Sequence, residues 1–259
     1  MLRVLIKLGG TLLDDSASRE RLSTEISHAA KSIQAVVVHG GGKQMTRFLA
    51  ERGIESKFVN GLRVTTPEVI DAVLKVFAGT VNHQLVASLV RAGSQAVGIS
   101  GIDASLVECD ALGGEYGFVG KPRQCNASLL EVLTTAGFTP VVACIGGDRN
   151  GNIYNVNADQ MAVACASGFR AGRLFFITDV DGVRDGSGQT LAQLTVSEMR
   201  TLIATGVATG GMQAKLEAAI LALESGVQQV VIAPGARCNV VTDLLQGIAI
   251  GTRLLQDPK

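Results

Sequence analysis

The stretch AVVVHGGGK (Ala35–Lys43) indicates the fold class of this 259-residue chain. Its apolar residues occupy consecutive positions, which is typical of a strand buried on both faces, as in a parallel sheet. Three glycines end the run, and a lysine follows them. Because ligands bind beyond the carboxyl ends of the strands in open α/β sheets, this glycine turn is a candidate ligand site.

Five more apolar runs have the same form, and most of them end in glycine. They are Val4–Gly10, Ala96–Gly101, Val141–Gly147, Leu174–Gly182 and Val231–Gly235. Helical patterns separate the runs, at Ser18–Ile33, Lys43–Arg52, Pro67–Arg91, Ser128–Ala136, Ala158–Ser167, Ser197–Thr205 and Met212–Ser225. This alternation predicts βαβ units in which helices cover a parallel sheet. Between Leu106 and Lys121 the pattern breaks, and we expect a hairpin inserted at one edge of the sheet.

The composition excludes several classes of function. Hydrophobic residues make up 47% of the chain, enough for a large core, and 23 basic residues balance 23 acidic ones. The chain therefore has no net positive charge to attract nucleic acid or an anionic membrane. Its low aromatic content (4%) argues against binding of single-stranded nucleic acid by stacking of bases on aromatic side chains. MLRVLIKLGG lacks the apolar region of a signal peptide, and we see no apolar run long enough to span a membrane. We expect a cytoplasmic protein, with its five cysteines as buried free thiols.

Glycine turns follow at least three of the runs, at Gly9-Gly10, Gly40–Gly42 and Gly146-Gly147. Glycine lets a ligand approach the backbone closely, and successive amides in a turn bind anions. The two common phosphate-binding motifs, G-x-x-x-x-G-K-[ST] and G-x-G-x-x-G, are both absent. The turns therefore predict a large anion that is held in another way.

Four charged residues near these turns each have a structural explanation, and three of them also have a functional interpretation. Lys7 is a strand-end lysine reaching solvent or a cation at the carboxyl edge of the sheet. Lys215, early in a helix that begins near Thr209, is a surface residue or a partner of a phosphate at that helix start. Asp159 fits the first turn of a helix that Asn157 caps, which is a sufficient structural explanation. Arg63 is a surface arginine or a clamp for a carboxylate.

The motifs IKLGG, VVVHGGGK, NGLRVT, NVNADQ, DVDGV and GGMQAK, in this order from Ile6 to Lys215, resemble the amino-acid kinase family. Within the family, NGLRVT with NVNAD is most similar to members that phosphorylate N-acetyl-L-glutamate in arginine biosynthesis. The resemblance implies a three-layer αβα sandwich with a central, mainly parallel sheet. It implies one domain, residues 1–259, with an acid-binding lobe of about 1–170 and a nucleotide-binding lobe of about 171–259. ATP and Mg²⁺ are the implied cofactors.

The resemblance also assigns roles to residues of this chain. Lys7 and Lys215 would stabilise the transferring phosphoryl group, and Asp159 would hold both lysines. The phosphate-binding amides would be those of Gly9, Gly10 and Gly40. Substrate would be bound by Gly41, Gly42, Arg63 and Asn155. The nucleotide site would be lined by Asp179, Val180, Asp181, Gly182, Val183, Arg184, Val207, Ala208 and Thr209.

The chemistry agrees with this assignment, because a carboxylate nucleophile is ionised at neutral pH and needs no general base. Catalysis then reduces to positioning and charge neutralisation. We therefore expect His28 and His83 to be structural and His39 not to act as a base. We also expect Lys43 to open a helix without touching phosphate, and no metal site made by the protein alone. The spacing around Asp148 lacks the glycine and glutamate of a calcium loop.

Two alternatives remain open. One is a related kinase that acts on a carrier-linked aminoadipate or glutamate, or on glutamate, aspartate or carbamate. The other is a non-catalytic nucleotide or oxyanion binder of the same fold, as in molybdenum storage proteins, although the presence of both Lys7 and Lys215 argues against it. Because the chain starts six residues before Lys7, the resemblance predicts an arginine-insensitive homodimer without an extra N-terminal helix.

Overall fold

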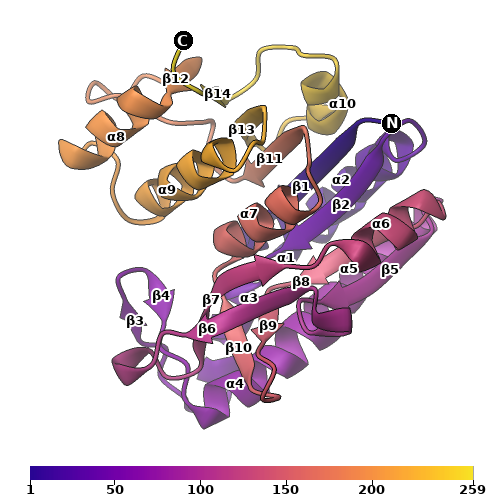
Figure 1. Ribbon diagram of the computed structural model, residues 1–259, viewed down its shortest axis with the longest axis vertical. Coiled ribbons are helices and arrows are strands. Elements are labelled where there is room, and N and C mark those ends of the chain that lie inside the picture. Colours follow the sequence, from indigo (N-terminus) through magenta and orange to yellow (C-terminus); the bar gives the residue numbers. More distant parts are fainter. Residues whose placement is uncertain (259) are drawn as a thin grey trace.

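An eight-stranded, mainly parallel sheet forms the centre of the computed structural model, which describes residues 1–258 (Figure 1). Its strand order is β12-β14-β13-β11-β1-β2-β8-β5, and only the β13–β14 pair is antiparallel. The strands are β1 (Arg3–Leu8), β2 (Gln34–His39), β5 (Ala96–Ser100), β8 (Thr139–Ala143), β11 (Arg173–Thr178), β12 (Gln193–Thr195), β13 (Gln229–Pro234) and β14 (Thr252–Leu255). The predicted αβα sandwich is confirmed.

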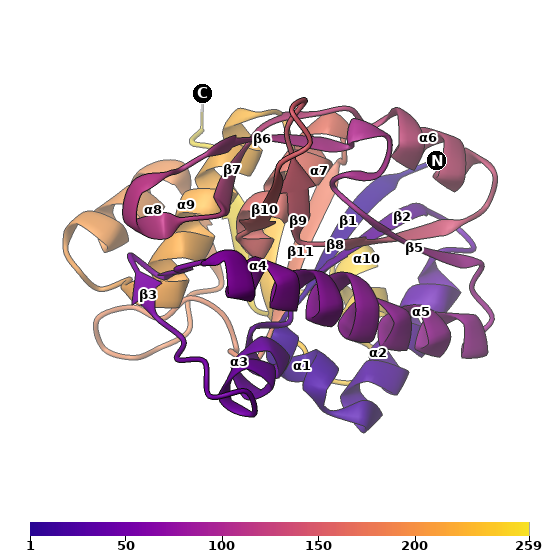
Figure 2. The same ribbon diagram turned by 90° about the horizontal axis from the view of Figure 1, so that it is seen from below.

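Helices cover both faces of the sheet (Figure 2). One face carries α6 (Ser128–Thr135), α7 (Ala158–Gly168), α8 (Val196–Ala204) and α9 (Gly210–Glu224). The other carries α2 (Ser16–Ala29), α5 (Asn82–Arg91) and α10 (Val240–Leu245), while α1 (Gly10–Asp14), α3 (Gly42–Ala50) and α4 (Pro67–Val73) pack in sequence on one another. The predicted caps are present: Thr66 and Asn157 side chains accept backbone N–H groups at the starts of α4 and α7.

The predicted helix Pro67–Arg91 forms, but its middle, η1 (Leu74–Val81), is π-helical. Among the described residues, this is the one helix that is long and apolar enough to cross a membrane, judged by length and composition alone. This corrects our expectation that the chain has no apolar run of sufficient length. Its inner face is nevertheless part of the core, through Val69, Val73, Phe77, Leu85 and Leu89. A core helix passes the same test of length and composition.

The predicted hairpin also forms, from β6 (Val107–Ala111) and β7 (Val119–Cys125). Its predicted place at an edge of the main sheet is wrong, because it pairs with β9 (Ile145–Gly147) and β10 (Ile153–Val156) in a small separate sheet. Its strands are only partly buried, unlike the strands at the centre of the main sheet. The remaining short elements are β3 (Phe58–Val59), β4 (Leu62–Arg63), η2 (Asp103–Ser105) and η3 (Gly114–Tyr116).

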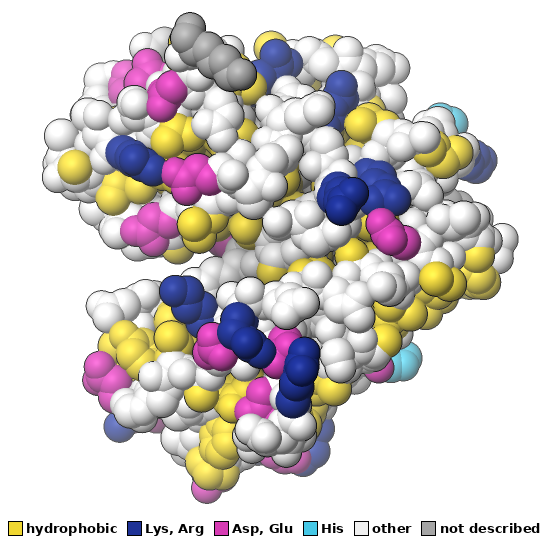
Figure 3. Space-filling model, in the orientation of Figure 1, with side chains coloured by type: hydrophobic (Ala, Val, Ile, Leu, Met, Phe, Trp, Pro, Cys, Tyr) yellow, Lys and Arg dark blue, Asp and Glu magenta, His cyan; other side chains and the backbone are white. Residues whose placement is uncertain are grey.

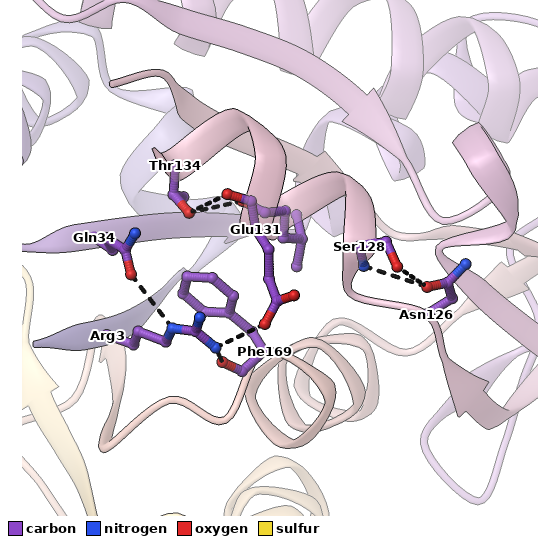
Figure 4. Close-up of polar contacts among 8 residues, drawn as sticks. Arg3, Gln34, Asn126, Ser128, Glu131, Thr134 and Phe169 are labelled. Atoms are coloured by element: carbon purple, nitrogen blue, oxygen red, sulfur yellow. Dashed lines mark hydrogen bonds and ion pairs between the residues drawn. The ribbon is translucent and has the colours of Figure 1, made fainter. Parts of the chain in front are cut away.

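Arg3 joins four elements at the amino end of the sheet (Figure 4). Its Nη1 donates to Glu131 Oε1 of α6 and to the carbonyl oxygen of Phe169, each at 2.9 Å. Its Nε donates to Gln34 Oε1 of β2 at 3.3 Å, and its guanidinium lies 4.9 Å from the centre of the Phe169 ring. This end of β1 is therefore fixed by contacts made entirely within the chain.

All five cysteines are free thiols. Cys109, Cys144 and Cys165 are buried, as expected, whereas Cys125 is half-buried and Cys238 is exposed. The expectation of five buried cysteines is wrong for these two. Cys238 lies in the loop before α10, where no apolar pattern surrounds it.

Candidate active site

Two glycine turns meet at the carboxyl ends of β1 and β2. A Cβ atom on Gly10 would lie 3.2 Å from the amide nitrogen of Gly41 and 3.1 Å from that of Gly42. A Cβ atom on Gly40 would lie 3.5 Å from Ala158, the first residue of α7. The amino ends of α1, α3 and α7 therefore converge on one point. Helix amino ends carry unpaired N–H groups and partial positive charge, which suits an anion.

The amides of these turns differ in what they bind. The Gly9 amide donates to the carbonyl of Ile177 at 2.9 Å, and the Gly40 amide donates to the carbonyl of Leu8 at 3.3 Å. Within residues 1–258, the amides of Gly10, Gly41 and Gly42 have no protein acceptor. Of the five predicted amide donors, these three are available to a ligand.

Lys7, Asp159 and Lys215 meet beside the glycine turns, although they come from β1, α7 and α9. Lys7 Nζ lies 2.7 Å from Asp159 Oδ1, and Lys215 Nζ lies 3.4 Å from Asp159 Oδ2. Lys7 and Asp159 are both 6% exposed. Burial alone would raise the pKa of Asp159, but the charges of Lys7 and Lys215 hold that pKa below its usual value. Two ammonium groups thus share the one carboxylate that contacts them both.

A cavity of about 150 Å³ opens next to these groups, lined by Gly40–Gly42, Arg63 and Asn155, among others. Arg63 is 8% exposed, and it donates to the Gly42 carbonyl (3.1 Å) and to Thr46 Oγ1 (2.9 Å). Within residues 1–258 its hydrogen-bond partners, which also include Ser56 Oγ, are all neutral, and burial lowers the pKa of its guanidinium. Burying an unpaired cation is costly, so this position suits an anionic ligand.

Asn155 is another polar side chain that lines the cavity. Its Nδ2 donates to Thr65 Oγ1 at 3.1 Å, and Thr65 Oγ1 in turn donates to the Arg63 carbonyl at 2.8 Å. This chain of hydrogen bonds fixes the Asn155 amide relative to β4. Phe58, 4.6 Å from the Arg63 guanidinium, supports the arginine from the other side. Sequence reasoning missed Thr46, Phe58 and Thr65, because no spacing marks them.

The predicted nucleotide residues lie in two loops at the other side of the hollow that Figure 3 shows between α8–α9 and β3–β4. Asp179–Arg184 follow β11, and Val207–Thr209 precede α9. A Cβ atom on Gly186 would lie 3.9 Å from the Val207 side chain, so the loops are neighbours. Val183 (0% exposed) and Ala208 (3%) are buried, so their side chains are not open to a ligand.

Asp179 connects these loops to the lysines. Burial would raise the pKa of Asp179, but hydrogen bonds from its own amide and from the hydroxyls of Thr178 and Thr11 lower it, together with the charge of Lys215.

Lys43 is exposed in the first turn of α3, and His39 is fully buried. Burial lowers the pKa of His39 to about 4, so its ring is neutral at pH 7.

Comparisons with known proteins identify relatives of this chain. The sequence profile of the amino acid kinase family matches residues 2–234. An acetylglutamate kinase from Solibacter usitatus (strain Ellin6076) is 60% identical over 255 residues, which cover 98% of this chain and 99% of that protein.

Two solved structures are similar in fold. The protein smu.665 from Streptococcus mutans UA159 has a TM-score of 0.84 at 29% identity and covers 98% of each chain. An N-acetylglutamate synthase from Neisseria gonorrhoeae, complexed with coenzyme A and N-acetyl-glutamate, has a TM-score of 0.86 at 23% identity, covering 99% of this chain and 60% of that one. From the profile match and the full-length relative, the chain belongs to the amino acid kinase family.

Proposed function

We propose that this chain transfers the γ-phosphoryl group of ATP to the side-chain carboxylate of N-acetyl-L-glutamate, giving N-acetyl-L-glutamyl 5-phosphate for arginine biosynthesis. The observation that carries the proposal is the pair Lys7 and Lys215 on one buried carboxylate, beside three unpaired glycine amides. Such a cluster neutralises the charge that spreads over a transferring phosphoryl group. The full-length relative named acetylglutamate kinase supports the choice of acid.

The acid binds in the cavity beside Arg63. Its α-carboxylate pairs with the unpaired Arg63 guanidinium, and its acetamido group meets Asn155. A charge-assisted bond to a buried arginine fixes both the position and the orientation of a carboxylate. The side-chain carboxylate then points towards the Gly41 and Gly42 amides.

In the reaction, a carboxylate oxygen forms a bond to the γ-phosphorus while the bond to the β,γ-bridging oxygen breaks, and ADP leaves. Lys7 and Lys215 stabilise the phosphoryl oxygens, and Asp159 holds the two ammonium groups in place. Gly10, Gly41 and Gly42 donate to the phosphoryl group, whereas Gly9 and Gly40 shape the turns, because their amides are already bonded. The carboxylate has no proton to lose, which is why no base is required.

The nucleotide lies along Asp179–Arg184 and Val207–Thr209, near Lys215. Within residues 1–258 no three His, Cys, Asp or Glu side chains cluster as a metal site, and Asp159 is committed to two lysines. These residues fit Mg²⁺ that is held mainly by the ATP phosphates and water, as Mg²⁺ prefers. Bound in that way, Mg²⁺ neutralises phosphate charge.

We also propose that residues 1–259 form one cytoplasmic domain, with an acid-binding lobe of about 1–170 and a nucleotide-binding lobe of about 171–259, and that two copies of it form a homodimer. The continuous sheet, which passes from β2 through β1 to β11, supports a single domain. Sedimentation equilibrium of the purified chain tests the dimer, and a monomer would contradict this part.

The decisive experiment traps the acyl phosphate with hydroxylamine in the presence of ATP, Mg²⁺ and a panel of acids. The panel contains N-acetyl-L-glutamate, glutamate, aspartate, carbamate and a carrier-linked aminoadipate. We expect the hydroxamate, and matching ADP release, mainly with N-acetyl-L-glutamate. Signal with another acid alone would overturn the substrate, and no signal with any acid would favour a non-catalytic binder.

A further inference from the structure

His39 is the last residue of β2 and lies directly before the glycine turn. Its side chain is fully buried. Nδ1 lies 2.9 Å from the carbonyl oxygen of Gly40, and Nε2 lies 3.0 Å from Nδ2 of Asn82. Asn82 is 2% exposed, and its Nδ2 also donates to the Val141 carbonyl of β8 at 2.9 Å. The ring therefore connects the glycine turn to the start of α5 and to the sheet.

The chemistry of these partners fixes the tautomer of His39. A carbonyl oxygen can only accept a hydrogen bond, so the proton is on Nδ1. Nε2 then carries a lone pair and accepts one N–H of Asn82, whose second N–H donates to Val141. Every donor on this path has an acceptor, and a proton added at Nε2 would face the Asn82 N–H group. The ring is thus held neutral, in one orientation.

The π-helical segment η1 brings two further side chains to the same turn. A Cβ atom on Gly41 would lie 2.9 Å from the Phe77 ring and 3.3 Å from Val81, so both residues pack directly against this glycine. Asn82 follows Val81 at once, where the π-helix passes into α5. Such π-helical turns are frequent at functional sites. Here η1 supplies the packing surface and Asn82 supplies the hydrogen bond.

We propose that His39 is a positioning residue for phosphoryl transfer: held by Asn82, it fixes the Gly40 carbonyl and so aims the Gly41 and Gly42 amides at the transferring group. The inference rests on the proposed role of those two amides. The peptide group that carries the Gly40 carbonyl also carries the Gly41 N–H, and it is planar, so fixing one fixes the other. A misaimed donor weakens binding to the transition state more than binding to the substrates.

The test compares His39→Asn with His39→Gln. The asparagine amide can place an N–H near the position of Nδ1 and keep the bond to Gly40, whereas glutamine can reach only the position of Nε2 and keep the bond to Asn82. We expect His39→Asn to retain kcat within about threefold and His39→Gln to lose about tenfold or more, with both KM values changed by less than about threefold. Equal kcat values in the two variants would overturn the proposal, whatever their Tm values.

A second variant reaches His39 through Asn82 alone. A Cβ atom on Gly98 of β5 would lie 2.0 Å from Asn82 Oδ1, so Gly98→Ala must displace that amide. We expect a loss in kcat of about fivefold or more, while Gly172→Ala, whose Cβ would meet nothing closer than 3.4 Å, keeps the wild-type value. Wild-type kcat in Gly98→Ala would overturn the link through Asn82. All variants are assayed with the acid that wild-type enzyme phosphorylates, so an error in the substrate does not affect the result.

Discussion

The two ends of strand β1 each carry a cationic side chain, and the two side chains differ in the partners that the rest of the chain provides. At the amino end, Arg3 finds a carboxylate, an amide oxygen and a carbonyl, and lies against an aromatic ring. At the carboxyl end, Lys7 shares the carboxylate of Asp159 with Lys215. The nearby amides of Gly10, Gly41 and Gly42 have no acceptor within residues 1–258, and the nearby Arg63 guanidinium has no anionic partner there. One end is complete within the chain, and the other keeps unused positive charge. A surplus of this kind distinguishes a binding site from a structural network.

The largest test of this contrast is Lys7→Met. We expect kcat to fall by roughly 10²–10³, since a preorganised donor to the transition state is lost. Lys31→Met, at an exposed position after α2, should leave kcat unchanged. Steady-state kinetics with saturating ATP and acid measure both variants. A Lys7→Met enzyme within threefold of wild type would mean that the surplus charge is not used in transfer.

Acid unfolding tests the buried imidazole at the same end of the sheet. His39 has a pKa of about 4 in the folded chain, because burial disfavours its charged form, against 6.5 for the unfolded reference. The unfolded chain therefore binds a proton first, and stability that is present above pH 6.5 is lost as the pH falls towards 4. The loss amounts to about 3 kcal/mol. Urea unfolding between pH 7 and 4 measures it, and His39→Asn should lack this part of the slope.

Arg63→Ala probes the unpaired guanidinium. We expect KM for the acid to rise by about 10–100-fold with a smaller change in kcat, because the arginine binds a part of the substrate that does not react. Arg52→Ala is the matched control, since Arg52 is exposed and lies over Phe48. An unchanged KM for the acid would exclude Arg63 as the clamp.

Arg3→Met should have the smallest effect on catalysis. We expect kcat and both KM values to stay at wild-type levels, while the free energy of unfolding falls by about 1–2 kcal/mol through lost hydrogen bonds. Arg91→Met, which breaks only an exposed ion pair with Glu20, should cost less than about 0.5 kcal/mol. If Arg3→Met lowered kcat, the two ends of β1 would be coupled, and the contrast between them would fail.

The fold could be predicted because its central strands are long apolar runs and its helices begin at recognisable caps, as at Thr66 and Asn157. The small sheet was misplaced, since its short, half-buried strands do not reveal their partners. The π-helical turn gave no signal, because its apolar pattern fits an α-helix equally well.

The site was predictable in its residue types but not in its contacts. Asp159 is explained by its helix position alone, and only the folded chain places it between two lysines. Likewise, the sequence does not reveal which carbonyl lies opposite each glycine. For that reason Gly9 and Gly40 could not be distinguished from the glycines whose amides are available.

The π-helical turn has a consequence for changes in chain length. A π-helix accommodates an extra residue within a helix that otherwise continues, so a single-codon deletion inside Leu74–Val81 could restore an unbroken α-helix. Asn82 would then keep its orientation relative to α4, because the deletion removes only the residue that the π-helical turn accommodates. A single-residue deletion in the α-helical parts of Pro67–Arg91 would instead turn the segment after it by about 100° relative to the segment before it, so deletions should be tolerated better inside Leu74–Val81 than on either side of it.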